Sequence, residues 1–480
     1  MPFYFYKNFI MSSYLYDLLK LIKVHDKMKV SERMDNVETS FEINLNLSDM
    51  SISKINEKII ALKSKIKKNQ EELLKLKMML DYTKLKNKGY SKKTIKNFYN
   101  QDMELINTAK KYLRKQQTCD KNYMFGYPAN LSDESAVIEY LRWIEGQLSY
   151  MNGCGTAYEK GNYRMCLHDN ELEIISRFIE NLGLSHDEYW GYITTGGTEG
   201  NLWGIREGFS HYPNGKLYFS DATHYSVIKG INIISNSNYE IISSNKGKIN
   251  CTDLINRIES NYKKDKSEAI LLLNYGTTEL GSIDDIKLIK TNLIKKNIPH
   301  YIHVDAALYG GIPRNQHDSP ISQNNFFNKL KIDSISISLH KYIGVPKTNG
   351  ILLARTQSNN RFIEYIGQSD VTLCGFRDYL PFTTVQKIRE NFDRNNEYDY
   401  SDNVKYMEQQ LKNNNITFFK GNEYGNIFII SKPNNRICEK FQLATFKYKN
   451  EEKAHIIVFP SHKKEKIDEL INDIIKNRCK

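Results

Sequence analysis

The chain is 480 residues long, and its 40% hydrophobic and 26% charged residues are typical of a globular protein with room for two or three domains. No apolar run approaches the roughly 20 residues that a membrane span needs. Charged residues interrupt the aromatic N-terminus, so we do not expect it to act as a signal peptide. The seven cysteines are scattered without a C-x-x-C pair, so we expect a reducing, cytoplasmic location.

One segment carries most of the net charge of +12. Residues 51–120 hold 18 Lys or Arg against 7 Asp or Glu, and the rest of the chain is close to neutral. A basic segment can bind RNA or another acidic partner, but no zinc-finger, RNP or basic-zipper pattern accompanies this one. We therefore interpret the lysines as a solvated helix face and keep nucleic acid as a minor alternative.

Three regions are expected in chain order. Residues 1–95 form a Lys-rich helical extension, residues 96–395 a large domain with an N-terminal arm, and residues 396–480 a small C-terminal domain. The small domain has strand-like runs at 427–430 and 456–459, followed by a terminal helix near 463–477.

The extension contains a heptad pattern. Apolar residues recur at alternating steps of three and four from Ile52 to Leu80, with Asn69 as the polar exception. This period predicts a helix. It leaves open whether the helix forms a coiled coil with another chain or lies on the large domain.

The large domain alternates short apolar runs with helical stretches, which predicts an α/β fold with a mostly parallel sheet. Helices are expected from about residues 198 and 224. Strands are expected at 192–194, 217–219, 269–273, 301–304 and 335–338, with a hairpin return at 350–353. Ligands collect at the carboxyl ends of such strands, and the polar motifs of this chain fall there.

Two motifs follow the first two strands. The run T-T-G-G-T-E-G-N at 194–201 places glycines at a strand-to-helix turn. There, backbone N–H groups can approach a phosphate, and the helix N-terminus favours its charge, although many such turns are only tight connections. His224 begins the next predicted helix, a position where histidine is more often a cap or structural donor than a catalyst.

Two further motifs follow the last two parallel strands. Asp305 ends a buried strand, where a carboxylate needs a cationic partner. A protonated pyridine nitrogen would serve, with a structural ion pair to an arginine as the alternative, and the small Ala307 leaves room for a flat ring. Lys341 follows another buried strand and suits a lysine that forms a Schiff base. Ser338 and His340 could complete a phosphate cradle.

Together these motifs resemble those of the group II pyridoxal phosphate-dependent amino-acid decarboxylases. T-T-G-G-T-E-G-N, D-A-T-H-Y-S-V at 221–227, H-V-D-A-A at 303–307 and S-x-S-x-H-K ending at Lys341 occur in order and at the expected spacing. The resemblance covers roughly residues 100–478 and is strongest to the histidine decarboxylase and serine decarboxylase branch. It implies the aspartate-aminotransferase-like fold, with a small C-terminal α/β domain.

The resemblance also implies residue roles. Lys341 would carry pyridoxal 5′-phosphate, Asp305 would pair with the pyridine nitrogen, and the imidazole of His224 would stack on the ring and touch the substrate. Thr277 or Thr278 would lie near the phenolic oxygen of the cofactor. The phosphate would be held by Gly197, Thr198, Ser338 and His340. No metal is expected.

The expected reaction is α-decarboxylation of an L-amino acid, with histidine the first candidate substrate and serine the second. The expected assembly is a homodimer with its active site at the subunit interface, away from membranes. The alternatives are another reaction on the same fold, such as transamination or desulfuration, and a non-catalytic binding protein that keeps the fold as a scaffold.

Three stretches depart from the family pattern, at residues 147–152, 162–168 and 375–380. In the family these stretches shape substrate access and the subunit contact. We therefore expect the cofactor site to be retained and the substrate to be the more variable property.

Overall fold

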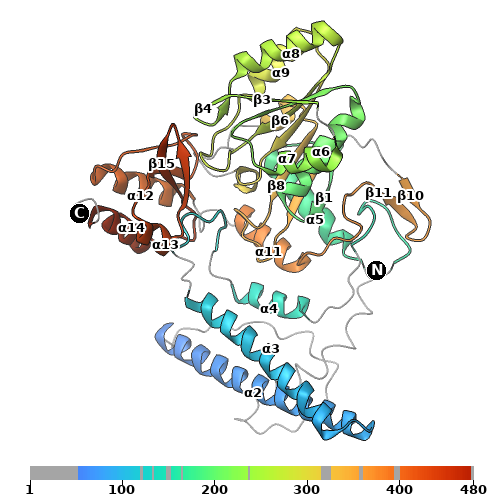
Figure 1. The fold of residues 1–480 in the computed structure, drawn as a ribbon, viewed down its shortest axis with the longest axis vertical. Helices are drawn as coiled ribbons and strands as arrows, with labels where there is room; N and C mark the ends of the chain where they lie inside the picture. The colour runs from blue at the N-terminus through green and yellow to red at the C-terminus, as the bar shows by residue number, and fades with distance from the viewer. Residues whose placement is uncertain are drawn as a thin grey trace. The chain divides into compact units, whose positions relative to one another are not determined.

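The computed structural model describes residues 52–118, 123–131, 135–146, 153–163, 166–235, 238–314, 326–355, 361–393 and 400–476. The altered stretch at 147–152 lies outside these residues. The chain divides into two compact units, Met1–Arg114 and Lys115–Lys480, coloured from blue to red along the chain in Figure 1. Each unit is described by itself.

The described residues of the N-terminal unit form α2 (Ile52–Asn87) and most of α3 (Lys92–Thr118), whose last turn lies beyond the unit boundary at Arg114. α2 covers the whole predicted heptad pattern, so the predicted helix is confirmed. The contacts described for α2 are with α3 of the same chain. The Tyr82 hydroxyl donates to Asp102 at 2.5 Å, and the Tyr82 ring meets that of Tyr99 edge to face. The proposed division at residue 95 stays a prediction, and α3 runs across it.

The second unit is built on a seven-stranded sheet with the order β1-β9-β8-β7-β6-β2-β3. The strands are β1 (Trp190–Thr194), β2 (Lys216–Ser220), β3 (Tyr239–Ile242), β6 (Ala269–Asn274), β7 (His300–Asp305), β8 (Ser334–Ser338) and β9 (Gly350–Ala354). β9 runs antiparallel to both β1 and β8, and the other neighbours are parallel. The predicted mostly parallel sheet and the hairpin return at β9 are confirmed.

Helices cover both faces of this sheet (Figure 1). Side chains alternate along the strands, so Leu217 and Ile270 face a cluster with α6 (Gly197–His211) and α7 (Ser226–Ile234). Tyr218 and Leu271 face the opposite, larger core. That core includes side chains of α5 (His168–Leu182), α8 (Cys251–Asp265), α9 (Ile286–Lys295), α10 (Phe326–Leu330) and α11 (Pro381–Phe392).

Short elements connect these layers. They are α4 (Ala136–Glu145), the 3-10 helix η4 (Tyr309–Gly311), and the two-stranded pairs β4 (Ser244–Asn245) with β5 (Lys248–Ile249) and β10 (Arg361–Ile363) with β11 (Gln368–Asp370).

The C-terminal part forms a four-stranded antiparallel sheet with the order β12-β13-β15-β14. Its strands are β12 (Phe418–Phe419), β13 (Ile427–Ser431), β14 (Ala444–Tyr448) and β15 (Glu451–Ile457), and its helices α12 (Tyr400–Asn413), α13 (Asn435–Lys440) and α14 (Lys464–Lys476). The strand predicted at 427–430 and the terminal helix are present. The strand predicted at 456–459 is only partly correct, because β15 begins before that run and ends at Ile457. No helix in the described ranges is long and apolar enough to cross a membrane.

Candidate active site

One cavity of about 270 Å³ lies where the large sheet presents the carboxyl ends of its parallel strands. All nine residues predicted for the site line it: Gly197, Thr198, His224, Thr277, Asp305, Ala307, Ser338, His340 and Lys341. They come from the last residues of β7 and β8, from the first turn of α6, and from the loops that follow β2, β6, β7 and β8. The fold therefore brings together residues that are spread over 145 positions of sequence, while their individual roles stay predictions.

The turn between β1 and α6 is pressed against the end of β8. The Gly197 N–H donates to the Ser338 hydroxyl at 3.2 Å, and the Ser336 hydroxyl donates to the Gly197 carbonyl at 3.1 Å. A Cβ atom on Gly197 would lie 2.8 Å from the Ser338 hydroxyl oxygen. The N-terminus of α6 and two serines thus form a tight polar cradle of the kind that binds phosphate.

Lys341 follows β8, and its side chain lines the cavity. Burial lowers the pKa of the Lys341 ammonium group, and the nearby charge of Asp305 partly opposes that effect. A lowered pKa increases the neutral amine fraction, which is the nucleophilic form. Burial also lowers the pKa of His340, whose Nδ1 donates to the Asn349 carbonyl at 2.9 Å.

Asp305 ends β7 as a buried carboxylate with two hydrogen bonds. Its Oδ1 accepts from the Ala307 N–H at 3.1 Å, and its Oδ2 accepts from Asn201 Nδ2 at 2.7 Å. Within the described ranges it forms no ion pair, so the structural arginine partner considered from the sequence is not found there. A buried carboxylate that lines the cavity without a direct ion pair in the described residues fits the protonated pyridine nitrogen of the expected cofactor.

His224 lies in the turn after β2, two residues before α7 begins. Its Nδ1 accepts from the Ser226 N–H at 3.2 Å and lies 2.8 Å from the Ser226 hydroxyl oxygen. Burial lowers the pKa of His224, while Asp305 raises it and Lys341 lowers it. Its ring therefore favours the neutral form.

The loop after β6 is held by a buried acid. Asp284 accepts hydrogen bonds from the backbone N–H groups of Ile249 and Asn274 and from the Asn274 amide, and burial raises its pKa to about 6. The Thr277 hydroxyl oxygen accepts from the Ser282 N–H at 2.9 Å. These bonds place Thr277 at the cavity wall.

Sequence reasoning missed several lining residues, including Thr195, Tyr225, Asn274 and Thr348. The most connected of those missed is Asn201, which bonds to Asp305 directly. Its signal was present in the sequence, because Asn201 lies four residues after Gly197 and therefore on the same face of α6.

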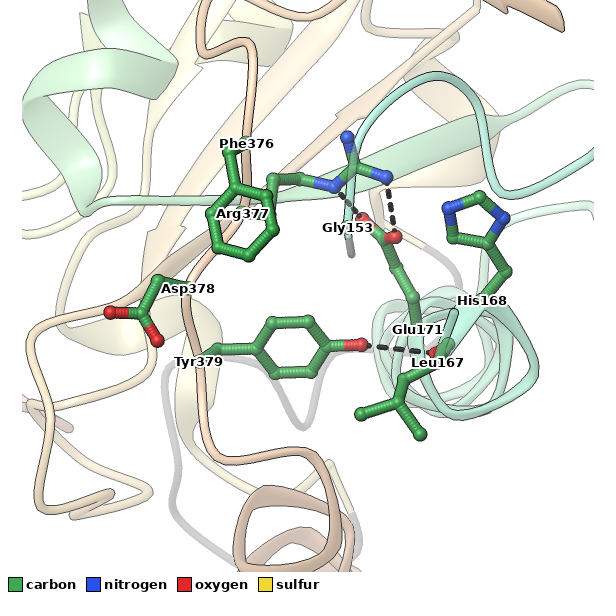
Figure 2. Close-up of a pocket in the computed structure, with 8 residues that line it drawn as sticks. All are labelled: Gly153, Leu167, His168, Glu171, Phe376, Arg377, Asp378 and Tyr379. Atoms are coloured by element: carbon green, nitrogen blue, oxygen red, sulfur yellow. Dashed lines mark hydrogen bonds and ion pairs between the residues drawn. The ribbon is translucent and has the colours of Figure 1, made fainter. Parts of the chain in front are cut away.

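A second, separate cavity lies beside the altered stretch at 375–380 and holds only about 20 Å³, room for one water molecule. Figure 2 shows that Arg377 and Glu171 are paired directly in its lining and that the Tyr379 hydroxyl donates to the Leu167 carbonyl. Because Arg377 is buried in this ion pair, its guanidinium group supports the fold around β1.

Comparisons with known proteins agree with this geometry. The conserved domain of pyridoxal-dependent decarboxylases matches residues 212–375. Histidine decarboxylase of Pseudomonas entomophila (strain L48) is 32% identical over 372 residues, 74% of this chain and 88% of the relative. Serine decarboxylase 2 of Oryza sativa subsp. japonica is 31% identical over 368 residues, 74% of this chain and 75% of the relative.

Solved structures share the fold at low identity. L-methionine decarboxylase from Streptomyces sp.590 superposes with a TM-score of 0.67 at 17% identity, over 79% of this chain and 95% of that chain. A sphingosine-1-phosphate lyase of Burkholderia pseudomallei K96243 superposes with a TM-score of 0.61 at 14% identity. The match covers 79% of this chain and 92% of that chain. Since these proteins act on different compounds, their likeness supports the architecture alone.

Proposed function

We propose that this chain, which belongs to the family of pyridoxal-dependent amino-acid decarboxylases, acts on L-histidine to release CO₂ and the corresponding amine. The observation that carries the proposal is the convergence of Lys341, Asp305 and His224 in one cavity. The choice of histidine is supported by the relatives named histidine decarboxylase, which cover 74–78% of this chain at 31–32% identity.

The cofactor is pyridoxal 5′-phosphate, which supplies an electron-accepting ring that stabilises negative charge at the substrate α-carbon when CO₂ leaves. Lys341, with its lowered ammonium pKa, would supply the amine that attaches the cofactor. Asp305, without an ion-pair partner in the described residues, would keep the pyridine nitrogen protonated. The cradle of Gly197, Thr198, Ser338 and His340 would bind the phosphate, and His224 would lie beside the ring and the substrate.

The substrate is tested by incubating the loaded protein with each common amino acid and measuring CO₂ release and the amine product. Histidine should give the highest kcat/KM, with serine as the second candidate because of the rice relative. A keto acid in place of CO₂ and an amine would instead indicate transamination. CO₂ release from a different amino acid would keep the reaction and reject histidine.

The proposed assembly is a cytoplasmic homodimer with its site at the subunit interface. The proposal is supported by large aromatic side chains that are exposed in the single chain and that a second subunit would cover. Tyr225 lines the cavity yet is 61% exposed, and the stacked Tyr140 and Trp143 are exposed on α4. Sedimentation analysis of the loaded protein tests the assembly, and a monomer with full activity would reject it.

A further inference from the structure

The Asn201 side chain bonds to Asp305 and also to Ser226, the residue that bonds to His224. Its side-chain nitrogen is 2.7 Å from Asp305 Oδ2 and 3.0 Å from the Ser226 hydroxyl oxygen. Its side-chain oxygen is 3.0 Å from Nε2 of His303. The Asn201 side chain is 1% exposed, so these bonds form out of contact with water.

The orientation of this amide follows from the chemistry of its partners. An ionised carboxylate only accepts hydrogen bonds, so the Asn201 atom beside Asp305 must be the NH₂ group. One N–H is donated to Asp305 and the other to the Ser226 oxygen. The amide oxygen is then left to accept from His303.

The hydrogen bond from Asn201 to Ser226 determines the tautomer of His224. Because the Ser226 oxygen accepts from Asn201, the Ser226 hydroxyl hydrogen is available to His224 Nδ1 at 2.8 Å. The Ser226 N–H points to the same Nδ1 at 3.2 Å. With two donors directed at it, Nδ1 is an acceptor, and the proton of neutral His224 lies on Nε2.

A hydrogen bond from His303 holds the Asn201 side chain in place on the side away from Ser226 and Asp305. Burial lowers the pKa of His303 to about 4, so its ring is neutral and donates through Nε2 to Asn201. Its Nδ1 then accepts from the Ser334 hydroxyl at 2.7 Å, and Ser334 accepts from the Tyr301 hydroxyl at 2.8 Å. A Cβ atom on Gly204 would lie 2.1 Å from the His303 ring, so α6 packs directly on that ring.

We propose that Asn201 is a positioning residue that acts on both polar groups of the site through one amide. It holds the Asp305 carboxylate in place, and through Ser226 it keeps His224 as the tautomer that donates from Nε2. An amide is required because it combines two donors with one acceptor. This inference rests on the proposed decarboxylase site, but it does not depend on which amino acid is the substrate.

The first test replaces Asn201 with aspartate and with alanine in the full chain and measures pyridoxal phosphate affinity from pH 5.5 to 8. At pH 8 both variants should bind about ten- to a hundredfold more weakly than the wild type, because a hydrogen bond to a charged group is lost. As the pH falls, the carboxyl group introduced by Asn201→Asp becomes protonated and can again donate one hydrogen bond to Asp305. The cofactor affinity of Asn201→Asp, divided by that of the wild type at the same pH, should therefore rise towards one as the pH falls. The same ratio for Asn201→Ala should stay constant.

Asn261→Asp is the matched control. The Asn261 amide also donates two hydrogen bonds, to the Tyr218 hydroxyl and to Glu240, but it does not line the cavity. Its affinity ratio should stay near one at every pH. Wild-type affinity in Asn201→Ala, or a pH-independent ratio in Asn201→Asp, would overturn the assignment.

The second test isolates the His224 branch with Ser226→Ala, and it applies even if the Asn201 variants do not fold. Cofactor affinity should stay within about twofold of wild type, because Asn201 still donates to Asp305. The ¹⁵N resonances of the His224 ring, identified by their loss in His224→Phe, should shift from the Nε2–H pattern towards a mixture of tautomers. Unchanged ¹⁵N resonances of His224 in Ser226→Ala would disprove the proposed effect of Asn201 on His224. Failure of the wild type to turn over histidine would disprove only the proposed substrate.

Discussion

Arg377 and Glu171, 206 residues apart in sequence, form a buried two-point ion pair. Arg377 Nε lies 2.7 Å from Glu171 Oε1, and Nη2 lies 2.8 Å from Oε2. The same Oε1 accepts the backbone N–H of Ile193 in β1 at 2.8 Å. The Glu171 carboxylate of α5 therefore joins the stretch at 375–380 to β1. This junction lies directly before the turn that leads to Gly197.

Arg377→Met should lower the free energy of unfolding by about 3–5 kcal/mol, because it leaves Glu171 charged, buried and without its cation. The double variant with Glu171→Gln should be less destabilised than the single variant, since no charge is then left unpaired. Denaturant unfolding measures both. Arg389→Met is the control, because Arg389 pairs with Glu173 at the surface, where such pairs contribute about 1 kcal/mol or less. Equal losses at both sites would contradict the role of burial.

Lys341→Ala should abolish the visible absorbance that borohydride-reducible cofactor gives, because its amine is the proposed point of attachment. The melting temperature of the cofactor-free protein should change little, since removal of an amine whose pKa burial lowers relieves a desolvation cost. Lys331→Ala, which alters an exposed lysine paired with Glu188, should keep the spectrum. Cofactor that is still fixed by borohydride in Lys341→Ala would disprove the attachment site.

Gly197→Ala should weaken pyridoxal phosphate binding by about tenfold or more, because its Cβ atom would lie 2.8 Å from the Ser338 hydroxyl oxygen and displace the cradle. Gly375→Ala serves as the control, since a Cβ atom there has no neighbour within 4 Å. An absorbance titration gives both dissociation constants. Similar values for the two variants would show that the tight turn is not needed for binding.

His462 should make the fold acid-sensitive. Its ring stacks on Phe125, its Nδ1 accepts from the Phe459 N–H, and burial lowers its pKa from 6.5 to about 4. Between these two values the unfolded chain binds a proton that the folded chain does not. Stability therefore falls as the pH drops from about 6.5 to 4, by about 3 kcal/mol from this group.

His462→Gln should remove that part of the pH dependence, which is measured as the change in unfolding free energy between pH 7.5 and pH 4.5. The comparison with wild type is needed because other groups titrate in the same range. His303, with a pKa of about 4, adds to the acid sensitivity. Asp284, whose pKa is raised to about 6, opposes it. An unchanged pH dependence in His462→Gln would show that the ring does not titrate as its burial predicts.

Deletion of residues 1–114 should leave pyridoxal phosphate bound, because every residue that lines the cavity around Lys341 lies in the unit Lys115–Lys480. The helices α2 and α3 are expected to add assembly or partner contacts rather than chemistry. A cofactor spectrum and sedimentation of the truncated protein test this expectation. Loss of both the cofactor and the assembly would place the N-terminal helices in the catalytic core.

Local patterns in the sequence were enough to predict the main strands and helices and the edge of the sheet at which the candidate site residues gather. Strands such as β6 and β8 are continuous apolar runs, α2 follows its heptad period, and the polar motifs sit directly after the strands. These are local patterns, and a parallel sheet brings the carboxyl ends of its strands to one edge. For that reason the positions of Lys341, Asp305 and His224 at one edge could be predicted together with the family resemblance, and all three line one cavity, while their roles stay predictions.

The side chains that support these residues became visible only in the folded chain. Arg377 pairs with Glu171 over 206 residues, and Asn201 reaches Asp305 over 104. The helical period places Asn201 on the same face of α6 as Gly197, but no pattern in one sequence shows which distant side chain Asn201 or Arg377 meets. Those pairings depend on how α5 and α6 pack on the sheet. Buried polar groups must find partners within a low-dielectric interior, and the packing of the whole domain determines which partners are within reach.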